Sequence, residues 1–203
     1  MAKEKLGVLC SGRGTDLQSI IDAIERGEVA AEIAVVLADK PDAYALTRAK
    51  KAGIPAVLVN RKEYEGREPF EEALIAALEA AGVTLVVLAG FMRILTPLFV
   101  RHFAGRILNI HPALLPSFPG AHAHHDVLAY GVKVSGCTVH FVDEGTDSGP
   151  IILQAAVPVL DDDTEETLGA RVLAQEHIIY PKAIQLYCEG KLKVEGRHVK
   201  IAE

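Results

Sequence analysis

The chain has 203 residues, a formal net charge of −6 and a 50% share of hydrophobic residues. A chain of this length fits one domain, and we predict a single domain spanning residues 1–203 with enough apolar side chains for one core. Its basic residues are scattered along the sequence. No basic stripe therefore marks a surface for nucleic acid or for a membrane, and we expect small-molecule partners.

The start of the chain and its cysteines indicate a reducing compartment. The apolar run at residues 6–10 is too short for the core of a secretory signal and has no cleavage pattern behind it, so we predict a cytoplasmic location. The apolar stretch at 83–100 is broken by glycine, arginine and proline, and we interpret it as a buried strand, a loop and a new helix. Three isolated thiols without CxxC spacing agree with such a compartment: Cys10, Cys137 and Cys188.

Strand-like and helix-like segments alternate in the first half of the chain. Short apolar runs rich in β-branched residues predict strands at 6–9, 33–37, 56–59, 85–88 and 107–110. Segments of helical period between them predict helices at 17–26, 43–52 and 69–80. This alternation is typical of βαβ units and predicts an α/β fold with a doubly wound, mostly parallel sheet.

The second half has a different texture. A loop rich in proline, glycine and histidine covers residues 112–125, and two strand-like runs follow at 135–142 and 151–157. We expect these runs, joined by the loop at 143–149, to add non-parallel strands to the sheet. The glycines in that loop, at 145 and 149, suggest a mobile segment.

The end of the chain reads as a long helix and a hairpin. The acidic residues 161–163 and Thr164 open an apolar-periodic helix that runs to about Glu189, and residues 191–203 resemble a hairpin turning at 195–196. We interpret the acid cluster as helix capping and as a complement to the helix dipole, rather than as a metal site.

Three motifs follow strands in the predicted parallel sheet. They occupy residues 11–16 after the first strand, 89–93 after the fourth, and 109–111 at the end of the fifth. In open α/β sheets ligands bind outside the carboxyl ends of the strands. We therefore expect the functional site at the edge where these motifs end.

The first motif, Ser-Gly-Arg-Gly-Thr-Asp at 11–16, can hold an anion. Its two glycines precede a helix, so that backbone N–H groups and the Thr15 hydroxyl can surround a phosphate. The motif lacks the lysine of a P-loop and the third glycine of the dinucleotide fingerprint, which favours a phosphomonoester. An ordinary tight turn between strand and helix would give the same pattern.

Asn109, His111 and Asp147 are the candidate catalytic residues. Asn109 and His111 lie two apart in an extended segment, so both side chains project to one face. An amide can donate to a developing oxyanion, an imidazole can move a proton near neutral pH, and a carboxylate can orient that imidazole. Structural roles remain open for each residue singly, and the three together favour acyl transfer.

The other histidines carry less weight. Those at 122, 124 and 125 lie in a loop without carboxylate or thiolate ligands at fixed positions, which is poor metal geometry, so we predict no metal site. His122 or His124 can still neighbour the reacting centre or a phosphate. We expect His140 to lie on the strand at 135–142 in register with its core face and to have a structural role.

These motifs resemble the phosphoribosylglycinamide formyltransferases, which are folate-dependent enzymes of purine biosynthesis. The resemblance runs nearly end to end and rests on residues 11–14, 88–95, 109–112, 114–116, 140–150 and 175–181. It implies a Rossmann-like formyltransferase fold. It also implies transfer of a formyl group from the co-substrate 10-formyltetrahydrofolate to the amine of glycinamide ribonucleotide, with these two small molecules as partners and with a possible homodimer.

The same resemblance assigns individual residues. Asn109, His111 and Asp147 match the catalytic trio. The positions that match the ribonucleotide site and its phosphate turn are Gly14, Thr15, Asp16, Gly90, Met92 and Glu176. The positions that match the folate cleft and its apolar walls are Met92, Arg93, Ile94, Leu95, Val142, Asp143, Glu144, Leu88, Phe99 and Ile107.

The chain departs from the family pattern at two places. Asp16 stands where members usually carry Asn beside the phosphate, and an anion facing an anion weakens binding unless Arg13 neutralises it. His125 stands where arginine is common. The alternatives within enzymes are a formyltetrahydrofolate hydrolase, or a formyltransferase acting on methionyl-tRNA or a sugar nucleotide, whose usual extra domain does not fit in this length. The alternative of another class is a non-catalytic folate or nucleotide-binding module.

Overall fold

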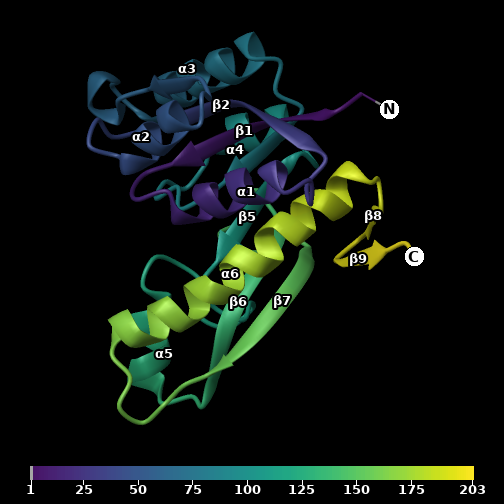
Figure 1. Cartoon of the computed structure of the whole chain (residues 1–203). Helices are drawn as coiled ribbons and strands as arrows, with labels where there is room; N and C mark the ends of the chain where they lie inside the picture. Colours follow the sequence, from purple (N-terminus) through teal and green to yellow (C-terminus); the bar gives the residue numbers. More distant parts are fainter. Residues whose placement is uncertain (1) are drawn as a thin grey trace. The chain divides into compact units, whose positions relative to one another are not determined.

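The computed structural model describes residues 2–203, which form two compact units divided after Leu108. The strand β5, Ile107–His111, passes from the first unit into the second. Each unit is described by itself below (Figure 1). The prediction of one formyltransferase domain over the whole chain stays a prediction.

The first unit alternates strands and helices, as the apolar pattern predicts. Its elements are β1 (Glu4–Cys10), α1 (Thr15–Glu25), β2 (Ala31–Ala38), α2 (Tyr44–Lys51), β3 (Ala56–Leu58), the 3-10 helix η1 (Arg61–Glu63), α3 (Arg67–Ala80), β4 (Leu85–Leu88) and α4 (Pro97–His102). The strands lie in the order β3-β2-β1-β4-β5, and β1 pairs in parallel with β2 on one side and β4 on the other. The carboxyl ends of β1 and β4 therefore point the same way.

The second unit mixes parallel and antiparallel pairs. Its elements after β5 are α5 (Ala123–Tyr130), β6 (Val134–Phe141), β7 (Ile151–Pro158), α6 (Glu165–Cys188), β8 (Leu192–Glu195) and β9 (His198–Ile201). The strands lie in the order β5-β6-β7-β9-β8. The pairs β6–β7 and β8–β9 are antiparallel, whereas β7 meets β9 in parallel at Ile151 and His198.

Amphipathic helices cover the strands because their apolar residues recur at helical spacing. In α1 the side chains of Leu17, Ile20 and Ile21 are buried, at steps of three and four. Helix α6 runs along β6 and β7 (Figure 1) and buries one face that includes Leu168 and Val172. No helix within residues 2–203 is long and apolar enough to cross a membrane.

The predicted fold class is confirmed: the sheet is mostly parallel in the first half and gains antiparallel strands in the second. The long helix α6 and the terminal hairpin lie where the sequence predicts them. Helix α5 is an addition, because it begins at Ala123 inside the segment predicted as a loop. Its buried side chains are only Ala123 and Val127, too few for a clear helical period.

Candidate active site

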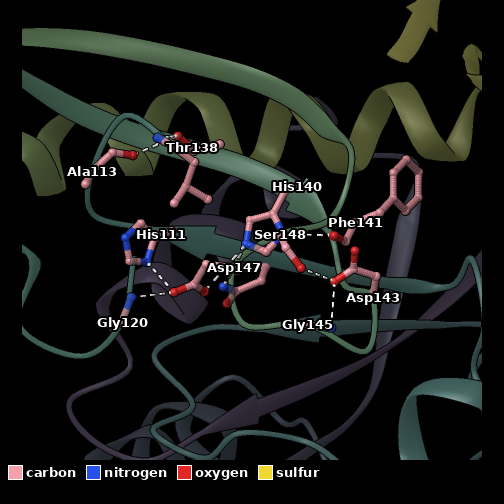
Figure 2. Close-up of polar contacts among 12 residues, drawn as sticks. His111, Ala113, Gly120, Thr138, His140, Phe141, Asp143, Gly145, Asp147 and Ser148 are labelled. Atoms are coloured by element: carbon pink, nitrogen blue, oxygen red, sulfur yellow. Dashed lines mark hydrogen bonds and ion pairs between the residues drawn. The ribbon is translucent and has the colours of Figure 1, made fainter. Parts of the chain in front are cut away.

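The predicted trio comes together in the second unit. Asn109 and His111 lie on β5, and Asp147 lies in the loop between β6 and β7. Figure 2 shows the His111 ring, the Asp147 carboxylate and the His140 ring turned toward one another. His111 Nδ1 lies 3.5 Å from Asp147 Oδ2, and His140 Nε2 lies 4.0 Å from Asp147 Oδ1.

The His111 ring is buried and has an oxygen at each nitrogen. Its residue exposure is 3%. Nε2 lies 2.7 Å from the carbonyl oxygen of Phe118, and Nδ1 faces Asp147. Both neighbours accept hydrogen bonds and neither donates one. Only an imidazole protonated on both nitrogens has a donor for each of them.

Asp147 accepts a backbone hydrogen bond and has an uncommon backbone conformation. Its Oδ2 accepts a hydrogen bond from the N–H of Gly120 at 2.7 Å (Figure 2), and its own φ is +50°, a left-handed conformation. A non-glycine residue in this conformation is uncommon and needs support from its surroundings. The neighbouring residues of the loop supply that support.

The loop at 143–149 is closed by its own side chains. Asp143 Oδ1 accepts from the Ser148 hydroxyl at 2.6 Å and from the Gly145 N–H at 3.0 Å (Figure 2). A Cβ on Gly149 would lie 1.7 Å from the carbonyl oxygen of Phe141, so only glycine fits there. This close approach explains Gly149 without mobility, and mobility of the loop stays a prediction.

Thr138 anchors the segment that follows His111. Its hydroxyl, buried on β6, donates to the carbonyl of Ala113 at 2.7 Å (Figure 2) and accepts from the Leu115 N–H at 3.1 Å. Gln154 on β7 donates to the Leu115 carbonyl at 2.9 Å. These bonds fix the chain between His111 and the Phe118 carbonyl that faces its ring.

Asn109 contacts a fourth polar residue. Its amide Nδ2 lies 3.2 Å from His140 Nε2. His140 Nδ1 in turn lies 2.8 Å from the carbonyl oxygen of Phe141 (Figure 2), and the residue is only 2% exposed. Burial lowers the pKa of the His140 imidazole below its ordinary value, more than the hydrogen bond to Phe141 and the Asp147 charge raise it.

In the first unit, the loop after β1 enters α1 through a glycine in the left-handed conformation. Gly14 precedes α1 with φ +73°, and a Cβ there would lie 2.8 Å from the Cβ of Ala45, so the turn requires glycine. Thr15 is the first residue of the helix. Asp16 is 8% exposed in the first turn, where the helix dipole favours a negative charge.

The first two predicted motifs meet in this unit. The Ser11 N–H donates to the Gly90 carbonyl at 3.0 Å, and the Ser11 hydroxyl accepts from the Met92 N–H at 2.9 Å. The loop after β1 and the loop after β4 are thus joined at the carboxyl ends of their strands, as predicted. Whether the third motif shares that edge stays a prediction.

Arg93 is tied to a buried carboxylate. Its Nε donates to Asp39 Oδ2 at 2.6 Å, and the Asp39 side chain has 0% exposure. The Arg93 side chain keeps 38% exposure.

Burial, and then the charges of Asp16 and Asp39, raise the pKa of the Cys10 thiol far above its ordinary range. Cys10 is therefore no candidate nucleophile.

The apolar residues predicted in the first unit to contact folate fall into two groups, one exposed and one buried. Met92 and Ile94 expose 60% and 65% of their surfaces, and Arg67 donates to the Ile94 carbonyl at 2.5 Å. The remaining apolar residues of the set are buried in the core, with exposures of 8% or less: Leu88, Leu95, Phe99 and Ile107. Buried residues can support such a site from behind, whereas Met92 and Ile94 are open to a ligand.

The predicted binding residues of the second unit lie between β6 and β7, at 142–144, or on α6. Val142 and Asp143 are half-buried and Glu144 is exposed. Glu176 lies on the buried face of α6 with 7% exposure. A buried carboxylate on this helix suits a hydrogen-bond acceptor for a hydroxyl group.

The acidic residues before α6 were predicted to cap the helix, but the cap is Thr164, and the acids form ion pairs instead. Thr164 caps the helix by accepting from the Thr167 N–H at 3.2 Å. Asp163 accepts from both terminal nitrogens of Arg171, at 2.7 and 2.9 Å, and this bond holds the pKa of its carboxyl below the usual range. Among residues 2–203 no group of three or more possible ligands is placed to hold a metal ion.

Sequence reasoning missed three groups that touch the trio: the His140 ring, the Phe118 carbonyl and the Gly120 N–H. The last two are backbone groups, which leave no signal in a side-chain pattern. His140 did leave one, because a histidine at a core-facing position of an apolar strand must find polar partners. That signal does not name the partner.

The chain is similar to known proteins over most of its length. The formyl transferase family model matches residues 4–184. The phosphoribosylglycinamide formyltransferase of Escherichia coli is 46% identical over 187 residues, which cover 92% of this chain and 88% of that protein. The crystal structure of glycinamide ribonucleotide transformylase 1 from Symbiobacterium toebii has a TM-score of 0.97 and 52% identity, covering 99% of this chain and 95% of that one.

Some relatives are much longer. The trifunctional purine biosynthetic protein adenosine-3 of Drosophila pseudoobscura pseudoobscura is 47% identical over 193 residues, which are 94% of this chain and only 14% of that protein. The chain thus spans about a seventh of the length of this relative. The match of the family model and the identity to the E. coli protein over most of both lengths establish membership. The chain belongs to the formyl transferase family and, within it, to the phosphoribosylglycinamide formyltransferases.

Proposed function

We propose that the protein transfers the formyl group of 10-formyltetrahydrofolate to the amine of glycinamide ribonucleotide, a step of de novo purine biosynthesis. The observation that carries this proposal is the contact of the buried His111 ring with Asp147, with Asn109 joined to the same cluster through His140. The names of the similar proteins support the choice of substrates. With it we propose a cytoplasmic location and a homodimer.

Asn109 and His111 would stabilise the charge that forms during the transfer. When the amine nitrogen bonds to the formyl carbon, the carbonyl electrons move to oxygen and an oxyanion develops. An N–H of the Asn109 amide donates to that oxygen, and the positive charge of protonated His111 attracts it. The Asp147 carboxylate, 3.5 Å from His111 Nδ1, balances that charge and orients the ring.

The Phe118 carbonyl refines the role of His111. Because Nε2 faces this carbonyl and Nδ1 faces Asp147, the ring acts on the oxyanion through its charge in this conformation. A direct hydrogen bond from Nε2 requires the Phe118 carbonyl to move away. The intermediate then collapses with cleavage of the bond between the formyl carbon and the folate nitrogen, which takes up the proton lost by the amine, through His111 or a bound water.

Exposed apolar side chains support the folate part of the proposal. A flat heteroaromatic ring needs apolar surface together with a few fixed polar groups. Met92 and Ile94 offer exposed apolar surface, and the Ser11, Asp39 and Arg67 contacts hold their loop in place. We propose that Met92, Arg93, Ile94 and Leu95 contact the formyl donor, with Val142, Asp143 and Glu144 as further contacts and with Leu88, Phe99 and Ile107 packed behind.

The ribonucleotide part rests on the turn before α1 and on Glu176. Backbone N–H groups at the start of a helix bind phosphate, and Gly14 and Thr15 stand there. We propose that these residues hold the phosphate, that Gly90 and Met92 lie near the nucleotide and that Glu176 accepts from a ribose hydroxyl. Asp16 is the one element that opposes this assignment, because it adds a negative charge at the phosphate position.

The test is the absorbance change on deformylation of 10-formyltetrahydrofolate by the purified protein, with and without glycinamide ribonucleotide. Turnover that requires the ribonucleotide supports the proposal. Turnover without it indicates a hydrolase, and no turnover in either case indicates another acceptor or a binding module. Both of these outcomes would overturn the proposed reaction.

A further inference from the structure

The buried histidine on β6, His140, has hydrogen-bond partners that fix its tautomer. A backbone carbonyl can only accept, so the Nδ1 that lies 2.8 Å from the Phe141 oxygen carries a hydrogen. In the neutral ring the other nitrogen, Nε2, is then an acceptor. Burial favours this neutral form, because it lowers the pKa of the imidazole.

The amide of Asn109 faces that acceptor. Its Nδ2 lies 3.2 Å from His140 Nε2, so one of its two N–H bonds donates to the histidine. The second N–H and the carbonyl oxygen of the amide are not used by His140. The orientation of an asparagine side chain, nitrogen against oxygen, follows from such a partner.

We infer that His140, as a neutral Nδ1–H tautomer, is a positioning residue that sets the orientation of the Asn109 amide and directs its second N–H toward the reacting oxygen. The catalytic meaning of this inference rests on the proposed function, in which Asn109 donates to the oxyanion. The tautomer and the hydrogen bond do not depend on it.

A neutral His140 also does not compete with His111 for the Asp147 carboxylate. His140 Nε2 lies 4.0 Å from Asp147 Oδ1, and His111 Nδ1 lies 3.5 Å from Oδ2 of the same carboxylate. A protonated His140 would present an N–H to the Asn109 amide nitrogen and would compete with His111 for Asp147. The acceptor tautomer avoids both conflicts while keeping two histidines beside one carboxylate.

The tautomer is measured directly by ¹⁵N NMR of the histidine rings of the whole protein at pH 7.5, where the two nitrogens of a neutral ring differ in shift. The His140 signals are assigned by their loss in His140→Gln. We expect a protonated Nδ1 and an unprotonated Nε2. A protonated Nε2 would overturn the inference, whatever the activity of the protein.

Kinetics test the positioning role with two variants. Leucine at 140 has no acceptor, whereas the glutamine side-chain oxygen can accept from Asn109. Misplacement of a catalytic group by about 1 Å can lower the reaction rate by about 10²-fold. We therefore expect His140→Leu to lower kcat by about 10- to 100-fold, with little change in the KM for the ribonucleotide or in the KM for the formyl donor. His140→Gln should recover a large part of this loss. His198→Gln, an exposed histidine on β9, is the matched control.

A double-mutant cycle separates this inference from the proposed function. If His140 acts through Asn109, His140→Leu has little further effect in an Asn109→Ala background. If His140→Leu keeps its kcat while Asn109→Ala loses turnover, the inference fails and the proposed function stands. If Asn109→Ala itself keeps its turnover, the proposed role of Asn109 fails, and the positioning role fails with it, whereas the NMR measurement still decides the tautomer. Thermal unfolding of each variant shows whether it is folded.

Discussion

The proposed active site draws its side chains from three places in the second unit: β5, β6 and the loop at 143–149. Asn109 and His111 share a face of β5 because side chains alternate along a strand, and this much follows from spacing alone. Their contacts with Asp147 and His140 depend on how β5 lies against β6 and on the left-handed backbone at 147. Neither feature is encoded in the local sequence pattern. The residue types and the family resemblance named the three residues, whereas nothing in the pattern named the contact of Asn109 with His140.

The first prediction at the residue scale concerns the trio. We expect Asn109→Ala to lower turnover by about 10²- to 10³-fold, the usual cost of losing one preorganised oxyanion donor. His111→Ala and Asp147→Ala should lower it as strongly, and combining them should add little because the residues act as a unit. Single-turnover rates of the folded variants measure this.

The matched control for the trio is Asp162→Asn, which removes a carboxylate from an exposed position before α6. It should leave turnover unchanged. Near-native rates in any of the three folded trio variants would remove that residue from the catalytic assignment.

Asp16 supplies a second residue-scale prediction. Its carboxylate lies in the first turn of α1, where we propose that phosphate binds. Two like charges about 4 Å apart repel by ~1 kcal/mol in water and more where burial lowers the dielectric constant, so Asp16→Asn should lower KM for the ribonucleotide by about 5-fold or more. The gain should shrink at high salt, since screening weakens the repulsion.

Asp22→Asn is the control for that experiment, because it makes the same charge change in the same helix, six residues further from the turn. It should alter KM far less. An unchanged or higher KM in Asp16→Asn would mean that the carboxylate does not face the phosphate.

At the scale of elements, the start of a helix could be predicted where the sequence contains a capping residue. Thr164 caps α6 in the structure, and the sequence predicted a helix opening at the same place. Helix α5 was missed because its eight residues begin inside a segment of proline, glycine and histidine and bury only two side chains. Its position follows from tertiary packing, which no local period reports.

The cap of α6 gives an element-scale prediction. Loss of a threonine N-cap typically costs about 1 kcal/mol, so Thr164→Ala should lower the free energy of unfolding by roughly that amount, while Thr164→Ser should retain most of it. Urea denaturation measures the change. Thr47→Ala, inside α2 and away from its ends, is the control and should be close to neutral. Equal effects of Thr164→Ala and Thr47→Ala would contradict the capping role.

At the scale of the whole molecule, the sequence predicted the fold class from alternating strand and helix patterns, and the sheet confirms it. The division into two compact units was not predicted: the change of sequence pattern starts only at residue 112, and no linker separates the two halves at Leu108. The boundary falls inside β5, so the chain gives no local sign of it. The free energy of unfolding of the whole molecule reports on the histidines of the second unit that are wholly or partly buried.

Two of those histidines make stability depend on pH in the same direction. Burial lowers the pKa values of His140 and His124 below their ordinary value of 6.5. Asp147 and Asp143 near His140, and Glu165 near His124, raise these pKa values, whereas the His111 charge lowers both, and burial remains the largest effect. As the pH falls, the two histidines therefore bind protons at a higher pH in the unfolded chain than in the folded chain.

Their contribution to stability is complete above pH 6.5 and is lost as the pH falls toward the lower pKa values of the folded state. We expect the free energy of unfolding in urea to fall from pH 7.5 to pH 5.5, a window in which most carboxylates do not titrate. His140→Gln removes one of the two groups, so its unfolding free energy should change less over this window than that of the wild type. His198→Gln, at an exposed position, should keep the wild-type slope. An unaltered slope in His140→Gln would mean that His140 is not held neutral by burial, and the tautomer that orients Asn109 would lose its physical basis.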